Sequence, residues 1–493
     1  MARVDLAFAF LLGCALLQHA FASPEFGSIG TVSSSFTIKN TVDSITPLLD
    51  AVDNNNGRTL KTDYSLLVTV LPLMEALGTN VASLGSAITT KLSASVPKND
   101  GNLNAAIDPV IDAIAPFKNF IDTLVASTRA TLKALLGDDI DHLFGDVFGN
   151  MKLSLDQLER ALLRLKGALA SATIKAGRAQ VDPALVMEVL VAASYLKATV
   201  TPVDYTIRSS IENVGYADDF LDGLQFMTTN LKESLEEYFT QFRDTLTDDG
   251  AYLADIATDF KNSLTVITNG VPAATSAMSS LPDYADMSTA LTKFGDVIAT
   301  LQSVPEMINQ EVTKITGIVN TFTTDYASIL VPRSYVSITY LMEVLISGGK
   351  YSRFCFFKYS PRLINYYALL VSDVESCYNY EIYRLESIID VAIYVNTMIA
   401  FDLEDLIDNL TACNTKASPG PCIKAIGPYY IKLSEKTVAK LATLIAYSYA
   451  ETKAATMRLG SCILTSKLEN MQKLVTAVKD IQTCHDVGPQ DPN

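Results

Sequence analysis

The fold of this 493-residue chain is decided by the stretch Cys413-Asn414-Thr415-Lys416-Ala417-Ser418-Pro419-Gly420-Pro421-Cys422. Proline and glycine in close succession end helices and favour turns, because proline lacks an amide donor and glycine tolerates unusual backbone angles. The two cysteines bracket this turn nine residues apart, so a bond between them would hold the flanking segments together. The stretch predicts a tight reversal between two helices.

The other cysteines extend this pattern outward. The intervals along the series Cys355, Cys377, Cys413, Cys422, Cys462 and Cys484 are 22, 36, 9, 40 and 22 residues. A helix turns about 100° per residue, so a separation of 36 residues returns a side chain to the same face, and 22 or 40 miss it by about 40°. Helical arms over residues 378–412 and 423–461, running antiparallel, would bring together three nested pairs: Cys413 with Cys422, Cys377 with Cys462, and Cys355 with Cys484.

One alternative pairing remains open from the sequence. Cys355 would bond to Cys377 and Cys462 to Cys484 if each segment folded back on itself. The pair Ser360-Pro361 favours a helix start, which would leave Cys355 in an extended segment before it. The outermost bridge is therefore the least constrained of the three.

The first 22 residues have the features of a secretory signal peptide. An apolar run from Leu6 to Leu17 is followed by Ala20-Phe21-Ala22, a small-residue cleavage pattern. Removal of residues 1–22 takes away Cys14 and leaves an even number of cysteines, which favours disulfides over metal binding in a secreted protein. We expect a secreted, extracellular chain with no transmembrane segment after cleavage.

The net charge excludes some partners. At −16, the chain lacks the basic surface that nucleic acid and anionic membranes require. We therefore expect neither nucleic acid nor an anionic membrane to bind this chain.

Apolar residues recur at helical spacing along most of the chain, which predicts an all-α fold of long antiparallel, coiled-coil-like helices. Three stripes carry this prediction: Leu291, Phe294, Ile298, Leu301, Ile308, Ile315, Phe322 and Ile329; Leu155, Leu158, Leu162, Leu165 and Leu169; and Ile107, Val110, Ile114, Phe117, Ile121, Leu124 and Thr128. The first stripe also suggests self-association. Expected helix starts are a capping box at Ser154 and Gln157, and the pairs Asp108-Pro109 and Asp182-Pro183.

Turn-forming clusters divide the chain. They lie at 53–57, 97–101, 137–139, 248–250, 270–282, 347–349 and 418–421. We expect a Cys-free amphipathic helical region at 23–335, as one bundle or as two with a break near 270–282. A six-cysteine helical domain follows at 351–486, with a flexible tail at 487–493. Of the 22 tyrosines, 12 lie between Tyr351 and Tyr449, which suggests a different core chemistry in this domain.

The opening of the cysteine region resembles a known family. The residues Cys355-Phe356-Phe357-Lys358-Tyr359-Ser360-Pro361-Arg362-Leu363, followed by Tyr366-Tyr367 and Cys377, are similar to the TsetseEP domain (DUF725) of secreted insect proteins. The resemblance covers Tyr351 to about Cys484. It implies an insect extracellular protein of gut or body fluid, in a family without an established enzymatic activity. The Glu-Pro repeats of the family's namesake are missing from this chain, so a role tied to them does not transfer.

Motifs for catalysis, metal or cofactor binding are not found in the sequence. Only His142 and His485 follow the leader, too few for a zinc site or a serine-hydrolase triad. The cluster at 53–57 is better read as a helix-connecting turn than as a calcium loop, since Val52 stands where the first carboxylate would be needed. The acids Glu233, Glu236 and Glu237, and likewise Glu404 and Asp405, are expected on solvated helix faces. We therefore expect no cofactor and no enzyme.

Two functions remain after these exclusions. The first is a non-enzymatic binding or structural role, with an unknown extracellular protein, glycan or apolar ligand as partner, in a gut or immune-responsive setting. The alternative is an extracellular carrier of lipid or another apolar ligand. The sequon Asn409-Leu410-Thr411 near the hairpin tip is a candidate N-glycosylation site, which would make the chain a glycoprotein.

Overall fold

The computed structural model describes residues 25–54, 57–275, 278–301, scattered positions between 303 and 321, and 336–489. About 87% of the chain is helical, so the predicted all-α fold is confirmed. Several predicted features lie outside the described residues: the leader 1–22, the positions Ile308, Ile315, Phe322 and Ile329 of one stripe, and the end of the tail, 490–493.

The chain forms two compact units, each built from separate stretches. Unit 1 comprises Met1–Leu224, Val336–Arg362 and Ala477–Asn493; unit 2 comprises Gln225–Tyr335 and Leu363–Thr476. Each unit therefore takes residues from both the Cys-free region and the cysteine region. Three helices run through both: α8 (Pro183–Thr275), α12 (Ser352–Asn414) and α13 (Pro419–Val487).

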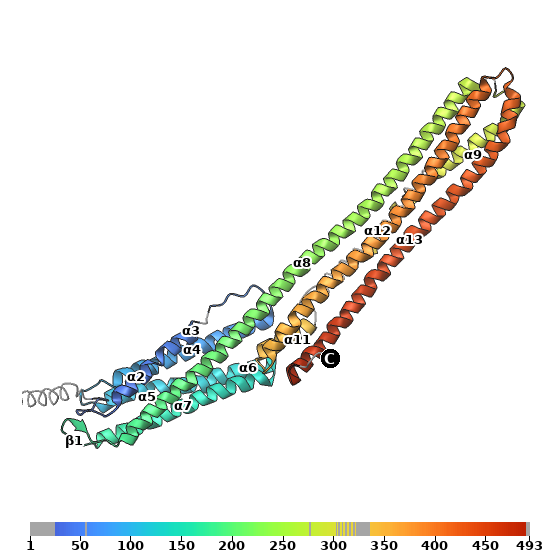
Figure 1. Ribbon diagram of the computed structural model, residues 1–493. Helices are drawn as coiled ribbons and strands as arrows, with labels where there is room; N and C mark the ends of the chain where they lie inside the picture. Colours follow the sequence, from blue (N-terminus) through green and yellow to red (C-terminus); the bar gives the residue numbers. More distant parts are fainter. Residues whose placement is uncertain are drawn as a thin grey trace, which may run out of the picture. The chain divides into compact units, whose positions relative to one another are not determined.

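Unit 1 is a helical bundle with one small hairpin. Its complete helices are α2 (Ser35–Asp43), α3 (Thr46–Asp53), α4 (Ser65–Ser95), α5 (Leu103–Phe120), the π-helical turn η1 (Ile121–Val125), α6 (Ala126–Leu136), α7 (Asp138–Ala170) and α11 (Val336–Ser347). The two-residue strands β1 (Ile174–Lys175) and β2 (Arg178–Ala179) pair antiparallel. Helix α4 packs against α2, α3 and α5, while α5 and α6 pack against α7, and α11 against α6 (Figure 1).

Helix α7 confirms one apolar stripe but not its predicted start. All five leucines of the predicted stripe are buried: Leu155, Leu158, Leu162, Leu165 and Leu169. The capping box at Ser154 is wrong, since α7 begins 16 residues earlier at Asp138, after Gly137 in a left-handed conformation. Ser154 is fully buried and donates to the carbonyl of Met151, with the hydroxyl of Thr199 3.1 Å away. Packing has thus extended the helix through a residue that locally favours a cap.

The stripe of α5 changes phase at the π-helical turn. Its predicted residues Ile107, Val110, Ile114, Phe117, Ile121 and Thr128 are buried, but Leu124 is exposed and Val125 takes the buried position. The π-turn widens one turn of the helix, so the buried position passes from Leu124 to Val125 before the stripe resumes at Thr128. The predicted cap at Asp108-Pro109 is also wrong, because Asn102 caps α5 by accepting from the amide of Ala105. By contrast Asp182 accepts from the amide of Ala184 at the start of α8, as expected.

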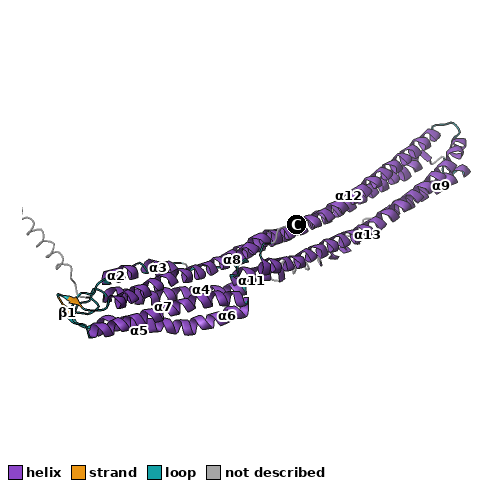
Figure 2. Ribbon diagram, turned by 60° about the horizontal axis from the view of Figure 1, so that its bottom comes forward, coloured by secondary structure: helices purple, strands orange, loops and turns teal. Residues whose placement is uncertain are grey.

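Unit 2 is a bundle of long helices. Its members are the second part of α8, the short 3-10 helix η2 (Pro282–Tyr284), α9 (Ala285–Leu301) and most of α12 and α13 (Figure 2). The predicted break at 248–250 is wrong, since α8 continues to Thr275. A glycine such as Gly250 costs a helix only about 1 kcal/mol, which packing along a long bundle offsets.

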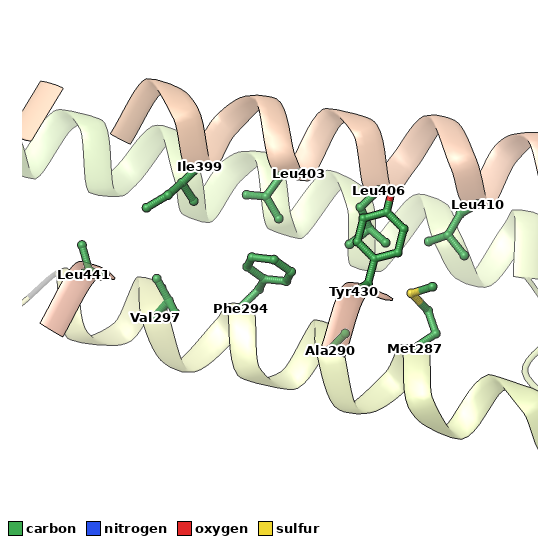
Figure 3. Close-up of a cluster of buried hydrophobic side chains, with 10 residues drawn as sticks. All are labelled: Met287, Ala290, Phe294, Val297, Ile399, Leu403, Leu406, Leu410, Tyr430 and Leu441. Atoms are coloured by element: carbon green, nitrogen blue, oxygen red, sulfur yellow. The ribbon is translucent and has the colours of Figure 1, made fainter. Parts of the chain in front are cut away.

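A compact apolar cluster joins three helices of unit 2. Figure 3 shows Met287, Ala290, Phe294 and Val297 on α9 facing Ile399, Leu403, Leu406 and Leu410 on α12, with Tyr430 and Leu441 from α13. The α12 residues recur every three or four positions, which is the seam of a coiled coil. Phe294, from the first predicted stripe, is buried here, and Leu291 packs against the cluster.

Two helices would be long and apolar enough to cross a membrane by length and composition. They are α4 and residues Pro183–Thr245 of α8. In the most apolar 18-residue window of each, 44% and 39% of the residues, respectively, are buried inside the protein. Core helices of soluble proteins pass the same test.

A polar residue, Asn396, interrupts the apolar seam of α12. Asn396 is 2% exposed, and both polar atoms of its amide lack a hydrogen-bond partner in the part of the chain that the structure describes. An unpaired buried amide destabilises a fold by about 1–3 kcal/mol. In coiled coils, a buried asparagine restricts the helices to one register at such a cost.

The substitution Asn396→Leu should therefore raise the free energy of unfolding by about 1–3 kcal/mol, because it removes the unpaired amide and adds apolar contacts. Chemical denaturation followed by circular dichroism measures this. The neighbouring Thr397→Leu, on the exposed side of α12, controls for helix propensity and should change stability by no more than about 0.5 kcal/mol. Equal effects of the two variants would contradict the expectation.

Candidate functional site

Three disulfides join the ends and the middle of the α12–α13 hairpin. The structure bonds Cys355 to Cys484, Cys377 to Cys462 and Cys413 to Cys422, with Cα–Cα distances of 5.9, 6.0 and 5.5 Å. These are the three nested pairs expected from helical phase, and their Cα distances lie in the usual range for disulfides. Three disulfides are typical of an oxidising, extracellular environment.

The outer bridge differs in its surroundings from the expectation. Helix α12 begins at Ser352, so Cys355 lies within the helix, and Ser360-Pro361 lies inside it as well. The prediction of an extended segment around Cys355 is wrong. Cys355 and Tyr359 are both buried, so tertiary packing supports the helix across the proline. The hairpin arms are consequently longer than the predicted 378–412 and 423–461.

An ion pair lies one helical turn from the middle disulfide. The Glu381 carboxylate, 5% exposed, accepts from Arg458 through Nε at 2.9 Å and Nη2 at 2.8 Å, in a bidentate geometry. Arg384 also donates to it at 2.9 Å, and Glu451 pairs with Arg458 at 2.6 Å. Hydrogen bonding to the two carboxylates raises the pKa of the Arg458 guanidinium above its ordinary value. The Glu381–Arg458 pair fixes the axial register of α12 against α13.

The hairpin tip places the sequon asparagine against a buried tyrosine. Asn409 is on the exposed side of α12, and its Nδ2 donates to the carbonyl of Asp405 at 2.9 Å and to the hydroxyl of Tyr430 at 2.8 Å. Tyr430 is 1% exposed, and burial raises the pKa of its hydroxyl. Beneath the Cys413–Cys422 bond, Met278 and Ile423 form a small apolar cluster.

The residues considered for chemistry do not assemble into a site. His485 Nε2 lies 3.1 Å from Asp139 in unit 1, beside the outer disulfide. Among the described residues, no group of three or more metal-ligating side chains is found. The acids Glu233, Glu236 and Glu237 are exposed on α8, and Glu404 and Asp405 are exposed on α12, as the sequence predicts.

Helix α12 exposes an apolar face instead. Six large side chains recur along it at helical spacing, each 40–68% exposed: Tyr380, Tyr383, Val391, Tyr394, Met398 and Phe401. We call this set the α12 stripe. At about 100° per residue, all six fall within about 80° of arc.

Helix α13 exposes a second face of aliphatic and thioether side chains. Met457, Leu464, Leu468, Met471 and Val475 are 41–70% exposed and fall within about 60° of arc. We call this set the α13 stripe. Single exposed apolar residues are common on proteins, but aligned rows of them are typical of interaction sites.

The sequence had indicated these tyrosines but not their place. The 12 tyrosines between Tyr351 and Tyr449 predict a different core chemistry, yet six of them are exposed: Tyr380, Tyr383, Tyr394, Tyr429, Tyr447 and Tyr449. The buried seam of α12 already accounts for one apolar residue every three or four positions. A second apolar row in the same helix, out of phase with the seam, is the signal that would have found the stripe.

Removing the middle disulfide should destabilise the protein more than removing the tip disulfide. The bonds close loops of 85 and 9 residues, and the chain-entropy model gives them stabilising contributions of about 4.6 and 2.6 kcal/mol respectively. We expect the double variant Cys377→Ser/Cys462→Ser to lose about 2 kcal/mol more than Cys413→Ser/Cys422→Ser. Urea unfolding of both variants measures the difference. A larger loss in the tip variant would refute the entropic account.

Comparison with known proteins finds no match for this chain. No known family matches the chain, no curated protein resembles it significantly, and no solved structure does so.

Proposed function

We propose that this chain is a secreted, non-enzymatic binding protein whose recognition surface is the outer face of the α12–α13 hairpin. The observation that carries the proposal is the α12 stripe, in which Tyr383, Tyr394 and Phe401 are each 63–68% exposed on a disulfide-bonded helix. Leaving such side chains in water forgoes about 1.5–3 kcal/mol each, which a partner would recover by covering them.

Aromatic side chains are well suited to this role. Tyrosine and phenylalanine bring a large contact area with few rotatable bonds, and they are enriched in the central part of protein interfaces. The disulfides hold the helix that carries them before any partner arrives. Such preorganisation reduces the conformational entropy lost on binding.

The setting is proposed from the resemblance of Cys355–Leu363 to the TsetseEP family. It supports an insect extracellular protein of gut or body fluid, in an immune-responsive or structural context. The leader 1–22, the even cysteine count and the three disulfides support passage through an oxidising secretory compartment.

Expression of the full chain in insect cells should release a protein that begins at Ser23, carries three disulfides and bears a glycan at Asn409. Intact mass spectrometry of the medium, with and without glycosidase treatment, measures all three properties. The variant Asn409→Gln is the control and should lack the glycan mass. Retention of residues 1–22, or of the protein inside the cells, would contradict secretion.

A photo-crosslinking amino acid, p-benzoylphenylalanine, tests the recognition surface. Placed at Tyr383 or Tyr394, it should give protein adducts in cell-free insect gut fluid or haemolymph after irradiation. Phe226 of α8 is the control position, since it is 69% exposed but lies outside the hairpin.

Equal adduct yields at Phe226 and at the stripe would overturn the recognition surface. So would the recovery of lipid adducts in place of protein adducts, an outcome that would support a lipid carrier.

A further inference from the structure

The two stripes lie on the same side of the hairpin. Around α12, counted from Tyr383, the stripe centres at about 40°, the cysteines at about 120° and the buried seam at about 170°. Around α13, counted from Met457, the same features lie at about 0°, 140° and 210°. When two antiparallel helices are viewed from one end, the chain winds clockwise with increasing residue number in one helix and anticlockwise in the other. The shared order therefore puts both seams on one side and both stripes on the other.

The two helices have opposite charge. Residues 363–414 of α12 carry nine acidic and one basic side chain, whereas residues 419–476 of α13 carry three acidic and eight basic ones. This contrast stands out in a chain whose overall charge is −16. The outer face of the hairpin thus combines an acidic, aromatic half with a basic, aliphatic half.

Opposite charges on α12 and α13 also lie at matching positions along the hairpin axis. The Cys377–Cys462 bond sets the two helices level with each other. Nine residues along α12 from Cys377 is Glu386, and nine residues back along α13 from Cys462 is Lys453. Further towards the tip, Asp408 is level with Lys432 to within one residue. All four side chains are exposed.

The charges at one such height do not point at each other within the chain. Glu386 lies about 180° around α12 from the cysteines that face α13, and Lys453 about 180° around α13 from the cysteine that faces α12. Contact within the hairpin therefore does not account for this matched pair. A second hairpin laid against the outer face would bring such pairs together.

We propose that the outer face of the α12–α13 hairpin binds a second copy of this chain, with the two-fold axis parallel to the helices. In this arrangement the α12 stripe of one copy and the α13 stripe of the other follow one another along the interface and meet at Tyr383, which lies beside Met457 of the partner. The inference rests on the proposed function, since it names the partner of the same surface. The interface is isologous, so every contact occurs twice.

Charge selects this axis over the alternative. A two-fold axis perpendicular to the helices would lay α12 on the partner's α12, with acidic side chains on acidic ones. Like charges juxtaposed across an interface suppress that arrangement. Shape agrees with charge, since Tyr394 would lie over the exposed Ala446 of the partner and Phe401 over the exposed Ala439 of the partner.

Sedimentation equilibrium of the purified, secreted chain tests the proposal. We expect a dimer whose dissociation constant rises with salt concentration. The double variant Tyr383→Asp/Tyr394→Asp should raise that constant about a hundredfold or more, because both anchors occur twice per dimer. The control Phe226→Asp on α8 should leave it unchanged, and circular dichroism verifies that both variants fold. A monomer for the unaltered chain at about 50 μM would overturn the inference.

A charge exchange tests the orientation. Glu386→Lys alone, and Lys453→Glu alone, should each raise the dissociation constant about tenfold, and the two together should restore it to within about threefold of the unaltered chain. Because the two side chains point away from each other within one chain, restoration reports contact between copies. Lack of restoration would overturn the parallel axis. A mixture of isotope-labelled and unlabelled chains with p-benzoylphenylalanine at Tyr383 gives a second test. Crosslinks that join α12 of one copy to α12 of the other, instead of α12 to α13, would also overturn the parallel axis.

The two proposals can fail separately. A monomeric chain that still forms adducts with other proteins in insect fluid refutes self-association and leaves the recognition surface standing. A chain that forms no adduct from either stripe position, with itself or with other proteins, refutes both.

Discussion

The axial register between α12 and α13 is the constraint on which most of the packing in unit 2 depends. It is set by the Cys377–Cys462 bond and, one turn away, by the bidentate pair between Glu381 and Arg458. A slip of either helix by one residue would rotate its seam by about 100° and expose residues such as Leu403. The apolar cluster around Phe294, the burial of Tyr430 and the common direction of the two stripes all follow from this one alignment.

A buried carboxylate such as that of Glu381 is costly to keep, and it gives specificity more readily than stability. Its two arginines hold it in one geometry, whereas an apolar seam would pack almost as well in several. Asn396 adds a second polar position on the same helix, without partners among the described residues. Helix α12 thus contains polar residues where only one arrangement is tolerated, beside long apolar stretches that supply the stability.

The helical class and the cysteine pairs could be predicted from the sequence because both rest on periodicity, which a long bundle preserves. The start of α7 could not, since Ser154 is a good cap locally and only its burial against Thr199 shows why the helix continues. The exposure of Leu124 required knowledge of a π-turn that no residue type announces. The exposed tyrosines were missed for a related reason: an apolar residue at helical spacing belongs equally well to a core or to an outer face, and only the positions of its neighbours decide.

The contact of Asn409 with Tyr430 has a consequence for the hairpin tip. The amide nitrogen carries two hydrogens, and both are in use, one on the Asp405 carbonyl and one on the Tyr430 hydroxyl. An N-linked sugar replaces one of these hydrogens, so an occupied sequon retains only one of the two bonds. The unoccupied tip keeps both bonds, whereas in the occupied tip either the Asp405 carbonyl of α12 or the Tyr430 hydroxyl of α13 loses its donor. The Cys413–Cys422 bond beside them keeps the helices together in both forms, so the tip can accept a sugar without the hairpin opening.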